Sequence, residues 1–332
     1  MLHLCLVYLD VMASKSLQKS FAIQNISVTL PNSQTIIIRL NSHLIMKQRI
    51  VEYDYVRAIA VLLVILGHCS YYAIMTDYGG VDYEINANQT LSGHLIGLIT
   101  AILYSFHMPL FVALSGCMYS LSVVNNRMRS FRPFVKKKIE RLIVPFLFVA
   151  LIWSIPLKYA SGYWEGSVSD VISQIFIGQF LMYGNYNSHL WFLLAIFNIF
   201  LLAFVIEKYN LRRKPIAFFC ALLIVSVLGQ WVSAHGYHLL GITQAMTYLI
   251  WFYAGFYFER NRVRINDFIT AHIGWISIVV TIMIYAILIY GRGYLLKITG
   301  MGYIIYYPLA LIGMISTYAL CYKALQITPP IY

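Results

Sequence analysis

The sequence predicts an all-α fold: a polytopic transmembrane helix bundle with about eight spans and a cytoplasmic N-terminus. Of the 332 residues, 60% are hydrophobic and only 11% are charged, a composition too apolar for a soluble protein of this length. Apolar runs long enough to cross a hydrocarbon layer of roughly 30 Å recur along most of the chain. The 27 Tyr and 6 Trp fit the aromatic belts found at both membrane interfaces.

The chain ahead of the first predicted span differs from the rest. Its opening apolar piece lacks a basic start and is interrupted by Asp10, so it does not read as a signal peptide. A short basic segment begins at Met46 and leads into the first span. We therefore expect residues 1–45 to be a non-native or disordered extension. The expected domains are this extension, a transmembrane domain over 46–325 and a short tail over 326–332.

The spans follow from apolar runs of crossing length. They are predicted at residues 56–75, 97–120, 143–160, 190–206, 216–234, 242–258, 272–290 and 303–322. A further apolar stretch, Val171 to Tyr183, is short and broken by Gly178. It predicts a re-entrant or interfacial segment.

The loop charges alternate as eight spans require, except for Arg292 and Lys297 in a short outer loop. The loops 125–141, 207–215 and 259–267 are rich in Lys and Arg and fall on the same side as the basic lead. The opposite loops 76–96 and 161–189 carry acidic residues and neither Lys nor Arg. The positive-inside rule then places the N-terminus in the cytoplasm. It also explains the net charge of +12 without a nucleic-acid partner, and we expect none.

The sequence predicts no metal site. The five cysteines are scattered and show neither metal-ligand spacing nor a disulfide framework. His235 and His238 have a metal-like spacing, but no carboxylate or cysteine stands beside them.

The first span carries the most informative pattern. Ten residues separate Arg57 from His68. Eleven helical steps bring the two residues back to within about 20° of one face, roughly 16 Å apart along it. Arg57 also fits ordinary anchoring at a helix end, with Asp54 as a neighbour one turn before it. Ionisable groups inside a membrane span usually face a cavity or a partner, so both residues are functional candidates.

A second histidine lies in the second span. His68 lies about twelve residues into the first span, and His107 lies about ten residues below the outer end of the second span, which runs in the opposite direction. The two histidines therefore fall near the same depth. Pro109 removes a backbone hydrogen bond and is expected to bend the helix. Ser115 and Gly116 are small enough for close helix approach. Two histidines at one level predict a polar pocket inside the membrane.

Four segments, taken in order, resemble the motifs of the membrane acyltransferase-3 family. They are Asp54–Arg57 through Gly67-His68, Phe106–Phe111 through Ser115-Gly116, Lys138–Phe146, and His189–Leu193. The resemblance covers roughly residues 50–325 and points to bacterial polysaccharide and sugar O-acetyltransferases. The family usually has about ten helices, whereas eight are predicted here. A truncated C-terminal part is therefore one interpretation of the sequence.

The resemblance implies O-acyl transfer, expected to be O-acetylation, in a multi-pass protein of the plasma (inner) membrane. No bound cofactor is expected; acyl-CoA, such as acetyl-CoA, would serve as donor co-substrate. A carbohydrate or a lipid-linked glycan would be the acceptor. The expected roles are catalytic for His68, Arg57 and His107, donor-binding for Arg57, Arg141 and Lys138, and substrate-binding for Ser115, His189 and Trp191.

The chemistry agrees with these roles, although simpler roles stay open. A neutral imidazole can take the proton of an attacking hydroxyl near pH 7, and Arg binds phosphates in bidentate fashion. Lys138 and Arg141 also fit topology control, and His189 and Trp191 fit interface anchoring. One alternative is a proton-coupled transporter or exporter that uses Arg57, His68 and His107. Another is a structural membrane subunit without activity.

Overall fold

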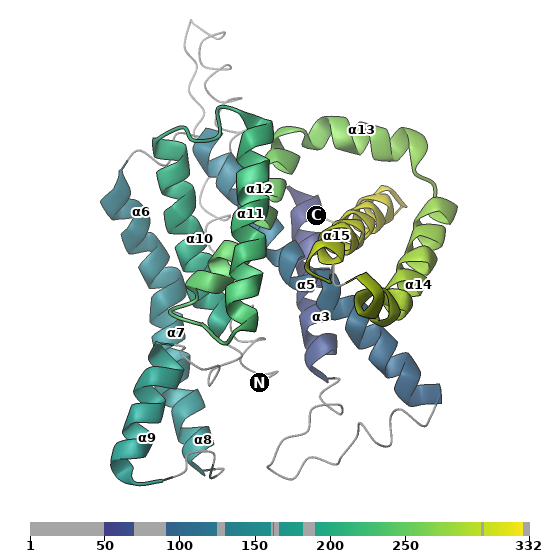
Figure 1. The fold of residues 1–332 in the computed structure, drawn as a ribbon. Coiled ribbons are helices and arrows are strands. Elements are labelled where there is room, and N and C mark those ends of the chain that lie inside the picture. Colours follow the sequence, from purple (N-terminus) through teal and green to yellow (C-terminus); the bar gives the residue numbers. More distant parts are fainter. Residues whose placement is uncertain are drawn as a thin grey trace, which may run out of the picture. The chain divides into compact units, whose positions relative to one another are not determined.

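The computed structural model describes residues 50–69, 91–124, 130–160, 162, 166–181, 190–299 and 302–327. Contacts divide the chain into Met1–Val51 and Glu52–Tyr332, and only residues 50 and 51 of the first unit are described. The predicted extension 1–45 lies outside the described residues. All regular elements among the described residues are helices, which confirms the predicted all-α class (Figure 1).

Twelve α-helices carry the described fold (Figure 1). They are α3 (Val51–Cys69), α5 (Leu91–Val124), α6 (Phe131–Lys138), α7 (Val144–Val149), α8 (Ile155–Ala160), α9 (Val168–Gln174), α10 (Trp191–Lys208), α11 (Pro215–Ala234), α12 (Ile242–Arg260), α13 (Arg262–His272), α14 (Trp275–Thr299) and α15 (Gly302–Ile327). Three π-helical stretches join them: Ile139–Ile143, Ala150–Ser154 and Ile175–Phe180.

Five described segments are long and apolar enough to cross a membrane. They are Leu98–Val124, Phe131–Ala160, Trp191–Lys208, Pro215–Ala234 and Tyr306–Ile327. A sixth is possible if Arg262–His272 and Trp275–Leu288, which are bent by 100° at their junction, form one broken span. This confirms a helical membrane protein, whereas the number of eight spans and the orientation of the N-terminus stay predictions.

The third apolar segment begins earlier than the sequence predicts. Residues 131–141, expected in a basic loop, are helical and continue into the span. Phe131 and Phe134 pack on Phe204 of α10, each at 5.2 Å between ring centroids, so α6 has an apolar side to bury. The π-helical stretch Ile139–Ile143 directly precedes α7, where Pro145 has no N–H to donate.

The core is built around α12, which packs against α5, α10 and α11 (Figure 1). Five of its residues between positions 251 and 256 are buried: Trp251, Phe252, Tyr253, Gly255 and Phe256. A helix covered on most sides needs no lipid-facing apolar stripe. α12 is nevertheless not among the five segments that are long and apolar enough to cross a membrane.

Two glycines let α5 and α12 approach backbone to backbone. A Cβ on Gly116 would lie 1.9 Å from the carbonyl oxygen of Phe252, and a Cβ on Gly255 would lie 1.9 Å from that of Ala113. Real Cβ atoms do not come this close to an oxygen, so both positions require glycine. The close approach predicted at Gly116 is therefore confirmed, and it fixes α5, the helix that carries His107.

Candidate functional site

A polar network holds the start of α3, the helix with the arginine–histidine pattern. The Tyr53 hydroxyl donates to the Glu259 carboxylate at the end of α12. Arg262, the first residue of α13, donates from Nε to the same carboxylate at 3.2 Å and from Nη1 to Glu52 at 3.3 Å. These residues come from three helices, so the network fastens α3 to α12 and α13.

The same network reaches α15. The amide of Asn266 on α13 donates to Glu52 at 3.4 Å, and its carbonyl oxygen accepts from the Tyr318 hydroxyl at 2.8 Å. Asn266 and Tyr318 are both buried. A buried polar group that loses its partner costs free energy, so a satisfied network of this kind favours one arrangement of helices.

Arg57 lies one turn beyond this network, in a more open position. Its side chain is 47% exposed, and Nη1 lies 3.7 Å from Oδ1 of Asp54, three residues earlier. An exposed ion pair of this length contributes little to stability. The guanidinium is thus held loosely and is accessible to an anion.

His68 belongs to the same helix, but its side chain lies outside the described part of the structure. The helix is continuous from Val51 to Cys69, so the eleven steps from position 57 to position 68 are all helical. Position 68 therefore returns to within about 20° of the face of position 57, as expected from the spacing.

His107 is buried in α5, only 3% exposed. Its Nδ1 lies 2.7 Å from the carbonyl oxygen of Leu103, which can only accept, so Nδ1 carries the proton in that contact. The neutral ring then has its lone pair on Nε2, the nitrogen that can act as a base. The ring of Tyr104 packs edge to face against it at 5.0 Å.

Ser115 does not present a free hydroxyl. Its Oγ donates to the carbonyl oxygen of Phe111 one turn earlier, at 3.1 Å. Serine commonly satisfies its hydroxyl this way inside a membrane helix. This contact and the neighbouring Gly116 point to a packing role for Ser115.

Two of the predicted donor-binding cations differ in their surroundings. Arg141 lies exposed in the π-helical stretch before α7. Lys138 turns its ammonium toward α10, where Nζ lies 3.1 Å from the centroid of the Phe200 ring. This cation–π contact occupies the partly buried ammonium. Arg141 is the more exposed of the two.

Trp191 opens α10 and packs on α12. Its ring stacks on Tyr248 at 5.5 Å between centroids, with 26° between the planes, and Phe192 meets it edge to face at 6.0 Å. His189, two residues earlier, lies outside the described residues. Trp191 is half-buried, so part of the ring remains open at the end of the helix.

His235 and His238, which have a metal-like spacing, each form a hydrogen bond with a residue nearby in the chain. Gln244 Nε2 donates to Nδ1 of His238 at 2.9 Å, and burial lowers the pKa of His238, which favours its neutral ring. His235 caps the end of α11, with Nδ1 2.8 Å from the carbonyl oxygen of Trp231.

The network at the start of α3 was missed from the sequence, where Arg262 counted only as a topology charge. Glu259 and Arg262 are three residues apart, which would suit a helical pair. The contact between Arg262 and Glu52 joins residues 210 positions apart, and no local pattern reveals it.

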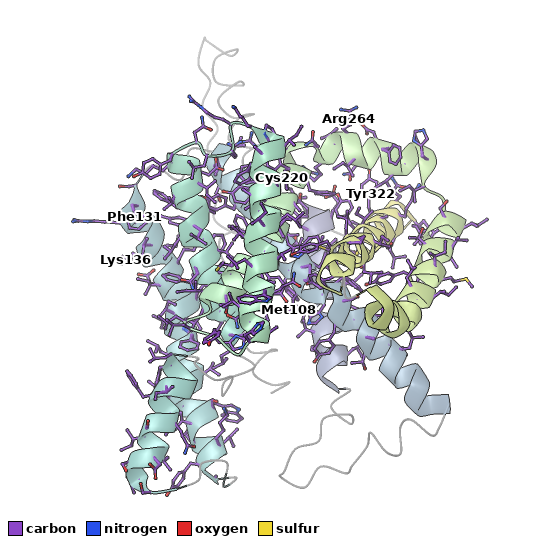
Figure 2. All side chains as sticks on the ribbon, viewed as in Figure 1. Met108, Phe131, Lys136, Cys220, Arg264 and Tyr322 are labelled. Carbon is purple, nitrogen blue, oxygen red and sulfur yellow. The ribbon has the colours of Figure 1, made fainter. Side chains whose placement is uncertain are left out.

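Arg262→Gln is expected to destabilise the protein, because Glu52 and Glu259 would lose their charged partner. The expected loss is about 1–3 kcal/mol, that of a buried polar group left without a hydrogen bond. Thermal unfolding in detergent measures it. Arg264→Gln is the matched control, since Arg264 lies exposed on the same helix (Figure 2). Equal melting temperatures for the two variants would refute a stabilising network.

Comparison with known proteins adds four findings. Residues 50–330 match the family Acyl_transf_3, described as an acyltransferase domain. The chain is 29% identical over 182 residues to nodulation protein NolL of Sinorhizobium fredii (strain NBRC 101917 / NGR234), a match that covers 54% of this chain and 42% of that protein. It is 30% identical over 163 residues to nodulation protein NolL of Mesorhizobium japonicum (strain LMG 29417 / CECT 9101 / MAFF 303099), covering 49% of this chain and 37% of that one. The matched part is thus about two fifths of each relative, and no solved structure matches.

Proposed function

The chain belongs to the acyltransferase family Acyl_transf_3, and from this membership we propose that it is an O-acyltransferase of the plasma (inner) membrane. The acyl group, expected to be acetyl, would pass from a cytoplasmic acyl-CoA to a hydroxyl of an envelope carbohydrate or a lipid-linked sugar. The observation that carries this proposal is the family match over residues 50–330, which includes the whole arginine–histidine helix.

We assign the general base to His68. Its imidazole accepts the proton of the acceptor hydroxyl as the oxygen attacks the thioester carbonyl. The carbon–sulfur bond then breaks, CoA leaves as the thiolate, and the imidazolium returns the proton to the sulfur. A histidine fits both steps because its ordinary pKa is near 6.5.

Arg57 is the residue we assign to the donor. Its exposed side chain makes a long contact of 3.7 Å to Asp54, which leaves room for an anion as a further partner. Arg141, also exposed, would add a second phosphate contact. Lys138 would contribute less, because its ammonium already lies on Phe200.

Arg57→Lys is expected to raise the KM for acyl-CoA, because lysine keeps the charge but cannot form two parallel hydrogen bonds to a phosphate. The expected increase is about tenfold, the effect of roughly 1.4 kcal/mol. Steady-state kinetics at varied acyl-CoA concentration measures it, with Arg264→Lys as the matched control. An unchanged KM would reduce Arg57 to a topology anchor.

His107 is assigned to the same pocket as His68, where it would orient the donor thioester. Cysteines placed at positions 68 and 107, in a background without other cysteines, are expected to be joined by short bifunctional reagents. The measurement is the fraction of protein cross-linked, with a cysteine at position 272 on α13 replacing that at 107 as the control. If neither short nor medium-length reagents join positions 68 and 107 in a variant that inserts normally, the site reduces to Arg57 and His68.

For the acceptor, we assign Trp191 as the main contact. Aromatic rings bind the apolar faces of sugars, and the stack with Tyr248 holds the Trp191 ring in place. His189, two residues earlier in the chain, is a further candidate. Ser115 is a secondary candidate, because its hydroxyl already donates to Phe111 within α5.

Ester analysis of whole cells tests the proposed acceptor class. Envelope carbohydrate from a strain that expresses the protein should release more alkali-labile acyl groups than carbohydrate from the strain without it. Equal release from both strains, with the protein inserted, would rule out an envelope carbohydrate as the acceptor.

A further inference from the structure

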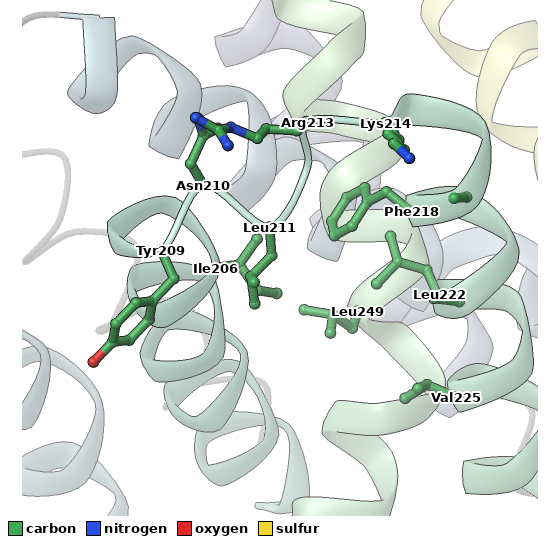
Figure 3. Close-up of a pocket in the computed structure, with 12 residues that line it drawn as sticks. Ile206, Tyr209, Asn210, Leu211, Arg213, Lys214, Phe218, Leu222, Val225 and Leu249 are labelled. Atoms are coloured by element: carbon green, nitrogen blue, oxygen red, sulfur yellow. The ribbon is translucent and has the colours of Figure 1, made fainter.

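A groove of about 600 Å³ lies between α10 and α11, with α12 contributing to its wall (Figure 3). Most of its lining is apolar. The lining residues are Ile206, Tyr209, Asn210, Leu211, Arg213, Lys214, Ala217, Phe218, Ala221, Leu222, Val225 and Leu249. None of these twelve is acidic. The groove is distinct from the residues assigned to acyl transfer.

The polar lining gathers at one end. Arg213 and Lys214 lie at the mouth together with Asn210, while Leu222, Leu249 and Val225 lie farther along (Figure 3). The mouth is formed by the connection between α10 and α11. The groove therefore has a cationic end and an apolar length that runs beside two segments able to cross a membrane.

The two mouth cations are available for a partner. The neighbouring Arg212 is already bound by Glu207, which accepts from its Nε at 2.7 Å and from its Nη2 at 2.8 Å. Arg213 and Lys214 are exposed, and neither has an ion pair among the residues that the structure describes. Glu207, near the end of α10, thus pairs with Arg212, and Arg213 and Lys214 keep the mouth positively charged.

We propose that this groove binds an anionic phospholipid from the surrounding bilayer. The phosphate of the headgroup lies at Arg213 and Lys214, and one acyl chain lies along the walls formed by Phe218, Leu222 and Leu249. Charge complementarity selects the headgroup, since basic pockets between transmembrane helices bind anionic headgroups at the cytoplasmic leaflet. The predicted orientation places the α10–α11 connection on that side.

The apolar length selects a lipid over a soluble anion. A free phosphate would use only the mouth, and the rest of the groove would gain nothing from it. An acyl chain instead fills apolar surface at a favourable free energy for each CH₂ group buried. A lipid is also the occupant that a bilayer supplies at high local concentration.

Native mass spectrometry of the full chain, released from nanodiscs, tests the proposal. The probes are phosphatidylglycerol and phosphatidylcholine with the same acyl chains. The parent protein is expected to retain phosphatidylglycerol preferentially. In Arg213→Gln/Lys214→Gln the preference should fall roughly 30-fold, the effect of two cations near a membrane surface. Lys208→Gln/Arg264→Gln, with the same change of charge outside the lining, should keep it.

A second variant tests the acyl-chain half of the groove. Ala221→Phe fills the groove from an exposed position, and Ile224→Phe places the same side chain on α11 at a residue that is 67% exposed and outside the lining. Only Ala221→Phe should lower lipid retention. Melting curves equal to that of the parent confirm that both variants fold.

Four results would overturn the proposal. One is equal retention of both lipids by the parent, and a second is no loss of preference in Arg213→Gln/Lys214→Gln. A third is unchanged retention in Ala221→Phe. The fourth is displacement of the lipid by glycerol 3-phosphate or by acyl-CoA, which would make the groove a site for a soluble phosphate or for the donor.

Discussion

His68→Ala is expected to lower the rate of acyl transfer by at least about 100-fold, the usual contribution of a general base. Alanine cannot accept the proton of the acceptor hydroxyl, so no positioned base would remove it from the attacking oxygen. The substitution removes only an imidazole from a helix whose start is fastened by Tyr53 and Glu52. Membrane insertion and melting temperature should therefore be preserved.

The control for this variant is His272→Ala, which removes an exposed histidine on α13. Turnover of labelled acetyl-CoA in purified protein measures both variants. A correctly inserted His68→Ala protein with near-normal turnover would contradict the role of His68 as base. Equal losses in both variants would point to a general effect of removing a histidine.

Gly255→Val is expected to cause the largest loss of stability, at least about 3 kcal/mol. Even the first added carbon would lie 1.9 Å from the carbonyl oxygen of Ala113, so α5 and α12 would have to separate. Cys117 reports this separation directly, because its buried thiol lies 3.1 Å from the carbonyl oxygen of Gly255. The rate at which a maleimide labels Cys117, followed by peptide mass spectrometry, should rise sharply.

Gly274→Ala is the matched control, because no atom lies within 4 Å of the Cβ it would gain. It should melt like the parent and leave Cys117 protected. Slow labelling of Cys117 in Gly255→Val, with a melting temperature equal to that of Gly274→Ala, would mean that α5 and α12 do not pack in this way.

Composition and apolar run length were enough to predict the class of fold, because both report how much of the chain can lie in lipid. They were less informative about where helices begin. The basic stretch before the third span reads as a loop, yet Phe131 and Phe134 bury one side of it on α10. Tertiary packing of two aromatic residues outweighs the charge pattern there.

Part of the candidate site could likewise be predicted from the sequence, and part depends on tertiary packing. The spacing of Arg57 and His68 depends only on helical geometry, so the sequence carries it. The contact of Arg262 with Glu52 and that of Lys138 with Phe200 depend on which helices become neighbours. Ser115 donates its hydroxyl hydrogen to Phe111 within its own helix, and its role as a substrate contact stays a prediction.

The central claim is that this chain is an acyltransferase and not a proton-coupled transporter. Purified protein in liposomes, given acetyl-CoA labelled in the acetyl group and a carbohydrate acceptor, tests it most directly, with acyl transfer and proton flux measured in the same vesicles. We expect labelled ester in the acceptor and an equal amount of free CoA, both lost in His68→Ala, without flux of protons. Proton-coupled flux that depends on His68, with no acyl group transferred and no thioester cleaved, would contradict it.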